Sequence, residues 1–181
     1  DPQDIINEVE ELAKEGYKEI TLLGQNVNSY KGNGNLGITK FSELLRAVNK
    51  ISGIERIRLS SLEPTIVDEE FAQRLSKLEK ICDHFHLSLQ SGCDETLKRM
   101  NRKYTTARYK ESTQILRKYY PNANFTTDVI VGFPGETDEE FNKTYQFLKE
   151  IEFYKMHIFK YSQRKGTKAA VMPNQIDGKI K

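Results

Sequence analysis

Short runs of apolar residues alternate along this chain with segments whose apolar residues recur every three or four positions. The runs predict buried strands, and the segments predict helices that bury one face. The five predicted strands are Glu19–Leu23, Ile54–Leu59, His84–Leu89, Phe125–Val131 and Lys155–Tyr161. Helices are expected before, between and after them, and the last one is expected to begin at Pro173.

Helix boundaries carry their own signals. Asp1, Thr39 and Asp68 each stand where a side chain can cap the first turn of a helix. Thr137 with Glu140 three residues later matches a capping box. Gly16 is expected to end the first helix.

Strands that are separated by helices predict a parallel sheet with right-handed crossovers. The fold class is therefore α/β, either an open doubly wound sheet or part of a (β/α) barrel. Five strands are too few for a complete eight-stranded barrel. No Gly-x-Gly-x-x-Gly follows the first strand immediately, since the one at Gly32–Gly37 begins nine residues after Leu23, which disfavours a dinucleotide-binding fold.

Composition narrows the class of protein further. A chain of 181 residues with 37% hydrophobic residues predicts one domain with a real core. The net charge of +2 gives no global signature of nucleic-acid binding. No apolar stretch predicts a membrane span or a signal peptide. Cys82 and Cys93 are expected to be free thiols in a reducing cytoplasm, since two cysteines make neither a disulfide framework nor a four-cysteine metal site.

Each predicted strand ends at a polar or glycine-rich cluster. The clusters are Gly24–Asn26, Ser60–Glu63, Gln90–Gly92, Gly132–Glu136 and Tyr161–Arg164. Any one of them is compatible with ordinary turn chemistry. Ligand sites of parallel α/β folds form at these strand ends, however. Amides and hydroxyls there suit a polar small molecule with ribose hydroxyls and an adenine edge.

Two features inside the strands leave alternatives open. His84 and His86 share one face of a strand, which permits shared metal ligation, although hydrogen-bonded strand histidines are the simpler interpretation. Asp128 interrupts an apolar strand, and a buried carboxylate needs partners. It is expected either to be structural or to point into the barrel.

The charge is distributed unevenly. Residues 97–118 carry eight basic residues against Glu111, and residues 155–181 carry seven against Asp177. Both basic segments flank strand ends, where phosphates of RNA could dock, and a solvated surface is the alternative.

Six segments together resemble the radical S-adenosylmethionine methylthiotransferases that modify tRNA. They read LLGQNV (22–27), RLSSLEP (58–64), LSLQSGCD (87–94), LKRMNRKYT (97–105), TDVIVGFPGET (127–137) and FKYSQRKGT (159–167). The resemblance covers essentially the whole chain. It implies a partial, open (β/α) barrel, of which residues 1–181 form the core.

The resemblance also implies a [4Fe–4S] cluster that cleaves S-adenosylmethionine to a 5′-deoxyadenosyl radical. The family holds this cluster with Cys-x-x-x-Cys-x-x-Cys, a motif that Cys82 and Cys93 cannot form. We therefore expect a core fragment that begins after the cluster loop and the first strand and ends before the RNA-binding domain. Such a fragment would hold no metal ligands and would be inactive alone.

The same resemblance assigns cofactor-binding residues. Gly24, Gln25 and Asn26 are expected near the methionine moiety, and Ser61 and Glu63 at the end of the next strand. Gln90 and Ser91 would reach the ribose or carboxylate, and Arg102 could pair with the methionyl carboxylate. Val131 and Phe133, with Gly132 between them, would flank the adenine.

The expected partners are the tRNA anticodon stem-loop and an electron-donor protein. Ser60–Pro64 and Tyr161–Thr167 favour the branch of the family that acts on N6-threonylcarbamoyladenosine. Gly24–Asn28 favours the N6-isopentenyladenosine branch, and a ribosomal-protein methylthiotransferase is a third option. From a different class, a non-catalytic nucleotide- or phosphate-binding domain would also explain the basic segments and glycine-rich strand ends.

Overall fold

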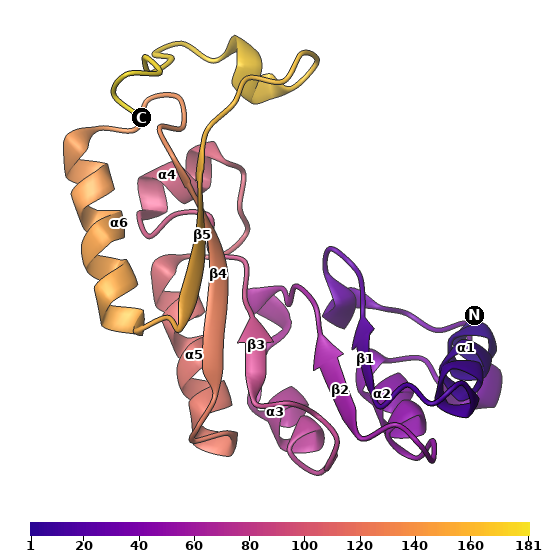
Figure 1. Cartoon of the computed structure of the whole chain (residues 1–181). Helices are drawn as coiled ribbons and strands as arrows, with labels where there is room; N and C mark the ends of the chain where they lie inside the picture. The colour runs from indigo at the N-terminus through magenta and orange to yellow at the C-terminus, as the bar shows by residue number, and fades with distance from the viewer.

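The computed structural model describes residues 1–181 and contains five strands that all run parallel (Figure 1). The strands are β1 (Glu19–Leu22), β2 (Arg56–Leu59), β3 (His84–His86), β4 (Asn124–Val131) and β5 (Lys155–Lys160). They form an open arrangement of two sheets, β1–β2 and β3–β4–β5. The predicted α/β class with about five parallel strands in a partial, open (β/α) barrel is confirmed.

The two sheets meet along a seam between β2 and β3. Only two isolated bridges, Ile57 with Ile81 and Leu62 with Leu87, cross this seam. The backbone hydrogen bonds that accompany them include Ile57 N to Lys80 O at 2.7 Å and Leu62 N to His86 O at 2.8 Å. The five strands thus form one arc in which few backbone hydrogen bonds connect β2 to β3.

Helices lie along the outside of this arc and follow the order of the strands. They are α1 (Pro2–Lys14), α2 (Phe41–Asn49), α3 (Glu69–Leu75), α4 (Asp94–Arg99), α5 (Thr106–Tyr119) and α6 (Asp138–Ile151). Four short 3₁₀ turns complete the chain: Val27–Ser29, Asn35–Gly37, Pro64–Ile66 and Lys168–Val171. Neighbouring helices pack in the sequence α1, α2, α3, α5, α6. No helix is long and apolar enough to cross a bilayer.

One apolar core of 27 buried residues joins the strands to the helices. Its members Ile57, Leu62 and Leu87 are fully buried on both sides of the seam. The seam is therefore closed by packing although it is poor in hydrogen bonds. The removal of these side chains from water is the main force that keeps the two sheets together.

Most of the expected helix starts are observed. Asp1 accepts a hydrogen bond from Gln3 N at 2.8 Å, and Thr137 and Glu140 form the predicted capping box. The start expected at Thr39 is shifted, because α2 begins at Phe41 and the carboxylate of Glu43 accepts from the backbone N–H groups of Thr39 and Lys40. These two bonds lower the pKa of Glu43 to about 2.

The helix expected from Pro173 is wrong. The segment runs as bends and turns, with Asn174 in the left-handed region at φ 58°. Its backbone instead docks on the loop after β4, where Gly135 N donates to Asn174 O at 2.9 Å. A left-handed residue interrupts the regular dihedral angles that a helix needs.

Candidate functional site

The carboxyl ends of the five parallel strands lie on one edge of the arc, at the same end as the C-terminal tail (Figure 1). We call this edge the rim. The polar clusters predicted from the sequence all follow strands there. The geometry of each cluster decides which side chains are available to a ligand.

The loops after β1 and β2 are joined directly. Ser60 Oγ accepts from Gly24 N at 3.0 Å and donates to Gly24 O at 2.7 Å. Val27 N donates to Ser61 O at 3.1 Å. The structure therefore joins Gly24 to Ser60 and Val27 to Ser61, and it leaves the side chains of Gln25 and Asn26 exposed.

The second loop is fixed by a buried amide. The side chain of Asn28 donates to Glu63 O at 3.0 Å and accepts from Glu63 N at 2.9 Å. The carboxylate of Glu63 is left half-buried beside Thr65, with a separation of 3.4 Å between Thr65 Oγ1 and Glu63 Oε1. Glu63 is thus held by its backbone while its charged group remains accessible.

Gln90 has a strained backbone four residues after β3, where an isolated bridge pairs it with Val129 of β4. Its φ of 69° lies in the left-handed region that disfavours side chains. Two hydrogen bonds to β4 hold it there: Gln90 N donates to Asp128 O and Ile130 N donates to Gln90 O, each at 2.9 Å. Strain that the surrounding sheet enforces is common at ligand sites. Gln90 is the strongest single candidate on the rim.

Ser91, in contrast, turns away from the rim. Its side chain is fully buried, its hydroxyl lies 3.1 Å from Thr144 Oγ1 of α6, and it accepts from Cys93 N at 3.2 Å. Gly92 allows this close packing, because a Cβ at that position would lie 2.8 Å from Phe147 Cβ. The expected contact of the Ser91 hydroxyl with a ligand at the rim is not supported by this orientation.

Arg102 is exposed after the left-handed turn at Asn101 (φ 59°). Next to it, Tyr104 donates to Ser88 O and Leu89 O at 2.8 and 3.0 Å, and burial raises the pKa of Tyr104 to about 12. The charges of Arg102 and Glu63 act on Tyr104 with opposite sign. The loops after β2 and β3 therefore converge at this tyrosine.

The loop after β4 is tightly wound around Gly132. Gly132 has a φ of 70°, and its N–H donates to Glu136 Oε2 at 2.6 Å. Phe133 is buried edge-to-face on Tyr161, with 5.2 Å between ring centroids, and Val131 is half-buried. Burial raises the pKa of Glu136. Val131 and Phe133 thus lie close together where β4 ends and its loop begins.

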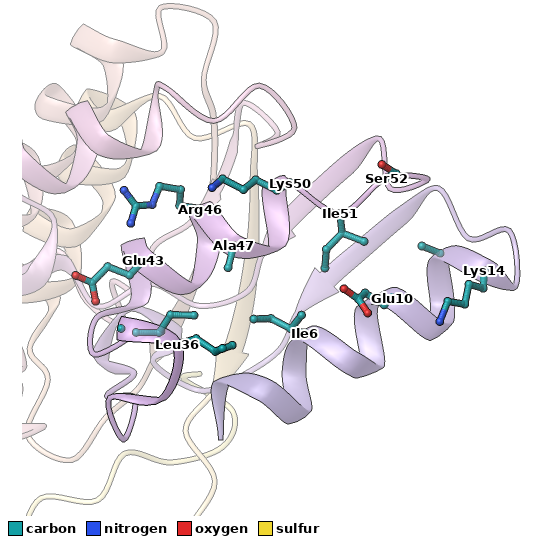
Figure 2. A pocket seen from close by; sticks show the side chains of 13 residues that line it. Ile6, Glu10, Lys14, Leu36, Glu43, Arg46, Ala47, Lys50, Ile51 and Ser52 are labelled. Atoms are coloured by element: carbon teal, nitrogen blue, oxygen red, sulfur yellow. The ribbon is translucent and has the colours of Figure 1, made fainter.

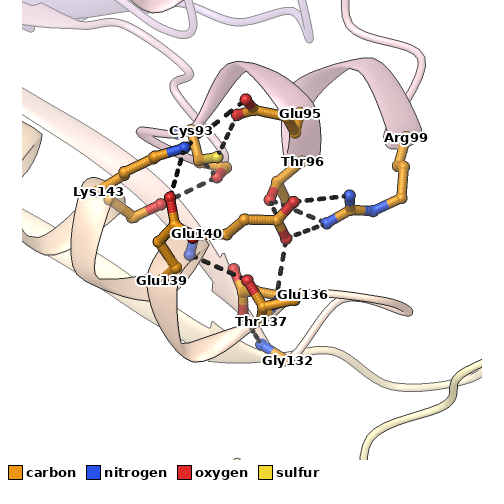
Figure 3. A network of polar contacts seen from close by, with 12 residues as sticks. Cys93, Glu95, Thr96, Arg99, Gly132, Glu136, Thr137, Glu139, Glu140 and Lys143 are labelled. Carbon is orange, nitrogen blue, oxygen red and sulfur yellow. Dashed lines mark hydrogen bonds and ion pairs between the residues drawn. The ribbon is translucent and has the colours of Figure 1, made fainter.

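An ion pair joins α4 to the start of α6, the helix that follows this loop (Figure 3). Arg99 donates to both carboxylate oxygens of Glu140, at 2.9 and 2.5 Å, and also to Thr96 Oγ1 at 3.2 Å. The same carboxylate accepts from Thr137 N at 3.1 Å. Hydrogen bonding to Arg99 lowers the pKa of Glu140, and Glu140 raises that of Arg99.

The inner face of the sheet carries the histidines predicted to share it. His86 Nδ1 lies 3.0 Å from Thr126 Oγ1, and His84 Nε2 lies 3.4 Å from the same oxygen. His86 Nε2 lies 3.5 Å from Asp128 Oδ2, so Asp128 points to the inner face and has a partner. Burial lowers the pKa of His84. The interpretation as hydrogen-bonded strand histidines is confirmed.

The residues of this chain do not fit an iron–sulfur cluster. Cys82 precedes β3 and Cys93 follows its other end, where its thiol donates to Glu95 Oε2 at 2.9 Å. No group of three or more His, Cys, Asp and Glu side chains is arranged to hold a metal ion. Burial raises the pKa of both thiols, which disfavours the thiolate that a metal requires.

The rim does fit a polar organic ligand. Glu136 Oε1 and Tyr161 Oη are buried near the loop after β4 without a hydrogen-bond partner. A cavity of about 440 Å³ lies between this loop, α6 and the C-terminal residues, and its lining includes Val131, Gly132 and Glu136. A second cavity of about 460 Å³ reaches Gly24 and Asn26. Unpaired polar atoms beside a cavity are what a nucleoside with several donors and acceptors would satisfy.

A larger hollow lies elsewhere. It encloses about 650 Å³ between α1, α2 and the turn at Leu36 and is lined by Ile6, Glu10 and Arg46 among others (Figure 2). None of the residues predicted to bind a cofactor lines it. Its size therefore does not make it the functional site.

Sequence reasoning missed the residues that hold the rim together. Asn28, Ser60 and Arg99 were read only as parts of motifs or charge runs, and Glu140 only as a helix cap. Asn28 continues the polar run from Gln25, which was the one available signal. Its partner, Glu63, lies 35 residues away, and no periodicity connects the two.

The family model of the Radical SAM superfamily matches residues 1–148. Two curated relatives are tRNA-2-methylthio-N(6)-dimethylallyladenosine synthases. That of Clostridium novyi (strain NT) is 48% identical over 181 residues, covering 100% of this chain and 40% of the relative. That of Alkaliphilus oremlandii (strain OhILAs) is 49% identical over 178 residues, covering 98% and 38%. The chain thus spans about two fifths of these relatives.

Solved structures share the fold. A radical S-adenosylmethionine methyltransferase from Kitasatospora setae aligns with a TM-score of 0.69 and 19% identity over 88% of this chain and 31% of that one. Coproporphyrinogen III oxidase from Escherichia coli aligns with a TM-score of 0.66 and 15% identity over 98% and 41%. At these identities the likeness concerns the arrangement of strands and helices.

Proposed function

The chain belongs to the radical SAM superfamily, and from this premise we propose that it is the barrel core of a longer tRNA methylthiotransferase acting on N6-dimethylallyladenosine. The observation that carries the proposal is identity of 48% over the entire chain to a relative with that activity in its name. The aligned region includes every strand end of the rim.

The relatives favour the alternative substrate branch over the expected one. The sequence motifs favoured N6-threonylcarbamoyladenosine, with the isopentenyl branch as the alternative. The relatives described above are named for dimethylallyladenosine, which carries the isopentenyl group. The motifs used for that expectation stand at the strand ends that are proposed to bind the cofactor, so they were a poor guide to the substrate.

S-adenosylmethionine is the proposed ligand of the rim. Cleaved reductively by a [4Fe–4S] cluster, it supplies the radical chemistry of this superfamily. Within this chain, Gln25, Asn26 and Gln90 are proposed to offer amide groups to the ligand. Arg102 is proposed to pair with its carboxylate, and Val131 with Phe133 to flank its adenine. Cluster ligands would have to come from outside these 181 residues, because no suitable cysteine set exists here.

Exposed basic residues support RNA as the macromolecular partner. Lys98, Arg102 and Lys103 come after β3. Lys160 ends β5, and Arg164 and Lys165 come after it. None of the six forms an ion pair within the chain. Cations that no carboxylate neutralises are available to phosphates. We propose that they face the tRNA backbone in the cytoplasm, and that a separate protein donates electrons.

Nucleoside analysis of tRNA tests the proposal. A strain lacking the gene should lose the 2-methylthio derivative of N6-dimethylallyladenosine and accumulate the unmodified precursor. Loss of the threonylcarbamoyl derivative instead would overturn the substrate assignment. In the complete enzyme, Gln90→Ala and Arg102→Ala should each weaken S-adenosylmethionine binding more than Cys82→Ala, since Cys82 lies at the opposite end of β3.

A further inference from the structure

The loops after β1 and β2 remain side by side beyond the point where regular strand pairing stops. The ladder between the two strands ends at Leu22 and Leu59. After it, only two backbone hydrogen bonds connect the two segments: Ser60 N to Leu22 O and Val27 N to Ser61 O, both at 3.1 Å. Two side chains complete the connection.

Each of these side chains binds both backbone polar groups of one residue on the opposite loop. Ser60 Oγ accepts from Gly24 N and donates to Gly24 O. The amide of Asn28 donates to Glu63 O and accepts from Glu63 N. An amide or hydroxyl that both donates and accepts can substitute for a strand partner in this way. We call the four bonds the Asn28/Ser60 contact.

The contact lies behind the surface on which a ligand would sit. Asn28 is only 6% exposed, so its amide is committed to Glu63. The rim residues Gln25 and Asn26 precede it on one loop, and Ser61 and Glu63 lie on the other. The separation of these two groups therefore depends on this contact together with the two backbone hydrogen bonds, because the strand ladder has already ended.

We propose that Asn28 and Ser60 are positioning residues for S-adenosylmethionine, which hold the two loops at a fixed separation so that they bind it as one surface. This inference rests on the proposed function. The physical reason is preorganisation: a loop that is already ordered does not lose conformational freedom on binding. Loss of either side chain would leave backbone groups of Gly24 or Glu63 unpaired and would loosen the loops.

Asn28→Asp in the complete, cluster-loaded enzyme is the sharpest test. The new carboxylate has the shape of the amide but cannot donate to Glu63 O. We expect the Kd for S-adenosylmethionine to rise about tenfold relative to the wild type at pH 8.5. Burial raises the pKa of a carboxyl group, and its protonated form donates again. The ratio of the Kd of Asn28→Asp to the Kd of the wild type should therefore fall towards one as the pH is lowered to 6.

Asn142→Asp is the matched control, because Asn142 is exposed on α6 and should give a ratio near one at both pH values. Should Asn28→Asp fail to fold, the serine provides a second test. Ser60→Ala should raise the Kd severalfold, and Ser60→Thr, which keeps the hydroxyl, should restore it. A purely structural role would lower the unfolding midpoint without this pH dependence or this rescue.

The outcomes separate the two proposals. If the wild-type enzyme binds S-adenosylmethionine and Asn28→Asp and Ser60→Ala bind it with the same affinity, the positioning role alone is overturned. A weakened Asn28→Asp variant that shows no recovery at pH 6 would also overturn it. No binding by the wild-type enzyme would overturn both the proposed function and this inference.

Discussion

The two halves of the rim are held together by different chemistry. The loops after β1 and β2 are joined by a neutral amide and a hydroxyl, Asn28 and Ser60. The helices that follow the loops after β3 and β4, α4 and α6, are joined by an ion pair between Arg99 and Glu140. A neutral contact is independent of pH, whereas an ion pair costs desolvation and fails when one partner is removed. Both contacts hold neighbouring segments of the rim together, but only the ion pair is expected to respond to pH and to the loss of one partner.

Removal of Arg99 should have the largest effect on stability. Arg99→Met leaves the Glu140 carboxylate, whose side chain is 12% exposed, without its partner. We expect a loss of about 3 kcal/mol in the free energy of unfolding, at the lower end for a broken buried pair because Arg99 itself is 30% exposed. Urea denaturation measures it.

The matched control is Arg74→Met, which removes an exposed arginine that pairs with Glu70 on α3. It should cost no more than about 0.5 kcal/mol. Equal losses in the two variants would contradict a special role for the Arg99–Glu140 pair.

Glycine substitutions compare how closely each half is packed. In Gly92→Ala the new Cβ would lie 3.0 Å from the backbone atom Thr144 Cα, so α6 must shift. We expect a loss of about 2 kcal/mol. In Gly24→Ala the nearest atom, at 2.9 Å, is Cγ1 of the Val27 side chain, which can rotate.

The Gly24→Ala variant should therefore lose less than about 1 kcal/mol. Thermal unfolding of both variants provides the measurement. A larger loss for Gly24→Ala than for Gly92→Ala would show that the neutral half is the more tightly packed one.

Two glutamates on the ionic half predict opposite responses to pH. The pKa of Glu140 is lowered, so its stabilisation is present above the usual value of 4.5 and is lost as the pH falls through the lowered pKa. The pKa of Glu136 is raised by burial, so its contribution is present at low pH and is lost as the pH rises through the raised pKa.

Glu136→Gln should therefore increase the free energy of unfolding at pH 7, by less than about 1 kcal/mol, and leave it unchanged at pH 4. The glutamine oxygen can still accept from Gly132 N. Urea denaturation at the two pH values checks this smallest of the effects, and destabilisation at pH 7 would contradict it.

The number of parallel strands and the edge at which the polar clusters gather followed from the sequence, because apolar runs separated by helices predict parallel strands. Strand length was less predictable. Ile54 is buried at 2% exposure but lies before β2, since burial of a side chain does not require strand pairing. The orientation of Ser91 depends on how closely α6 approaches Gly92, which is a property of the packed structure.

The seam between β2 and β3 should affect how fast backbone amides exchange their hydrogens with solvent. Its amides, such as that of Leu62, lie between two paired sheets and are protected by an apolar core rather than by a continuous ladder. Hydrogen exchange there would report small separations of the sheets that leave the fold intact. A ligand touching the loops after β1 and β4 would span the seam, so its binding should slow exchange at residues that it never touches.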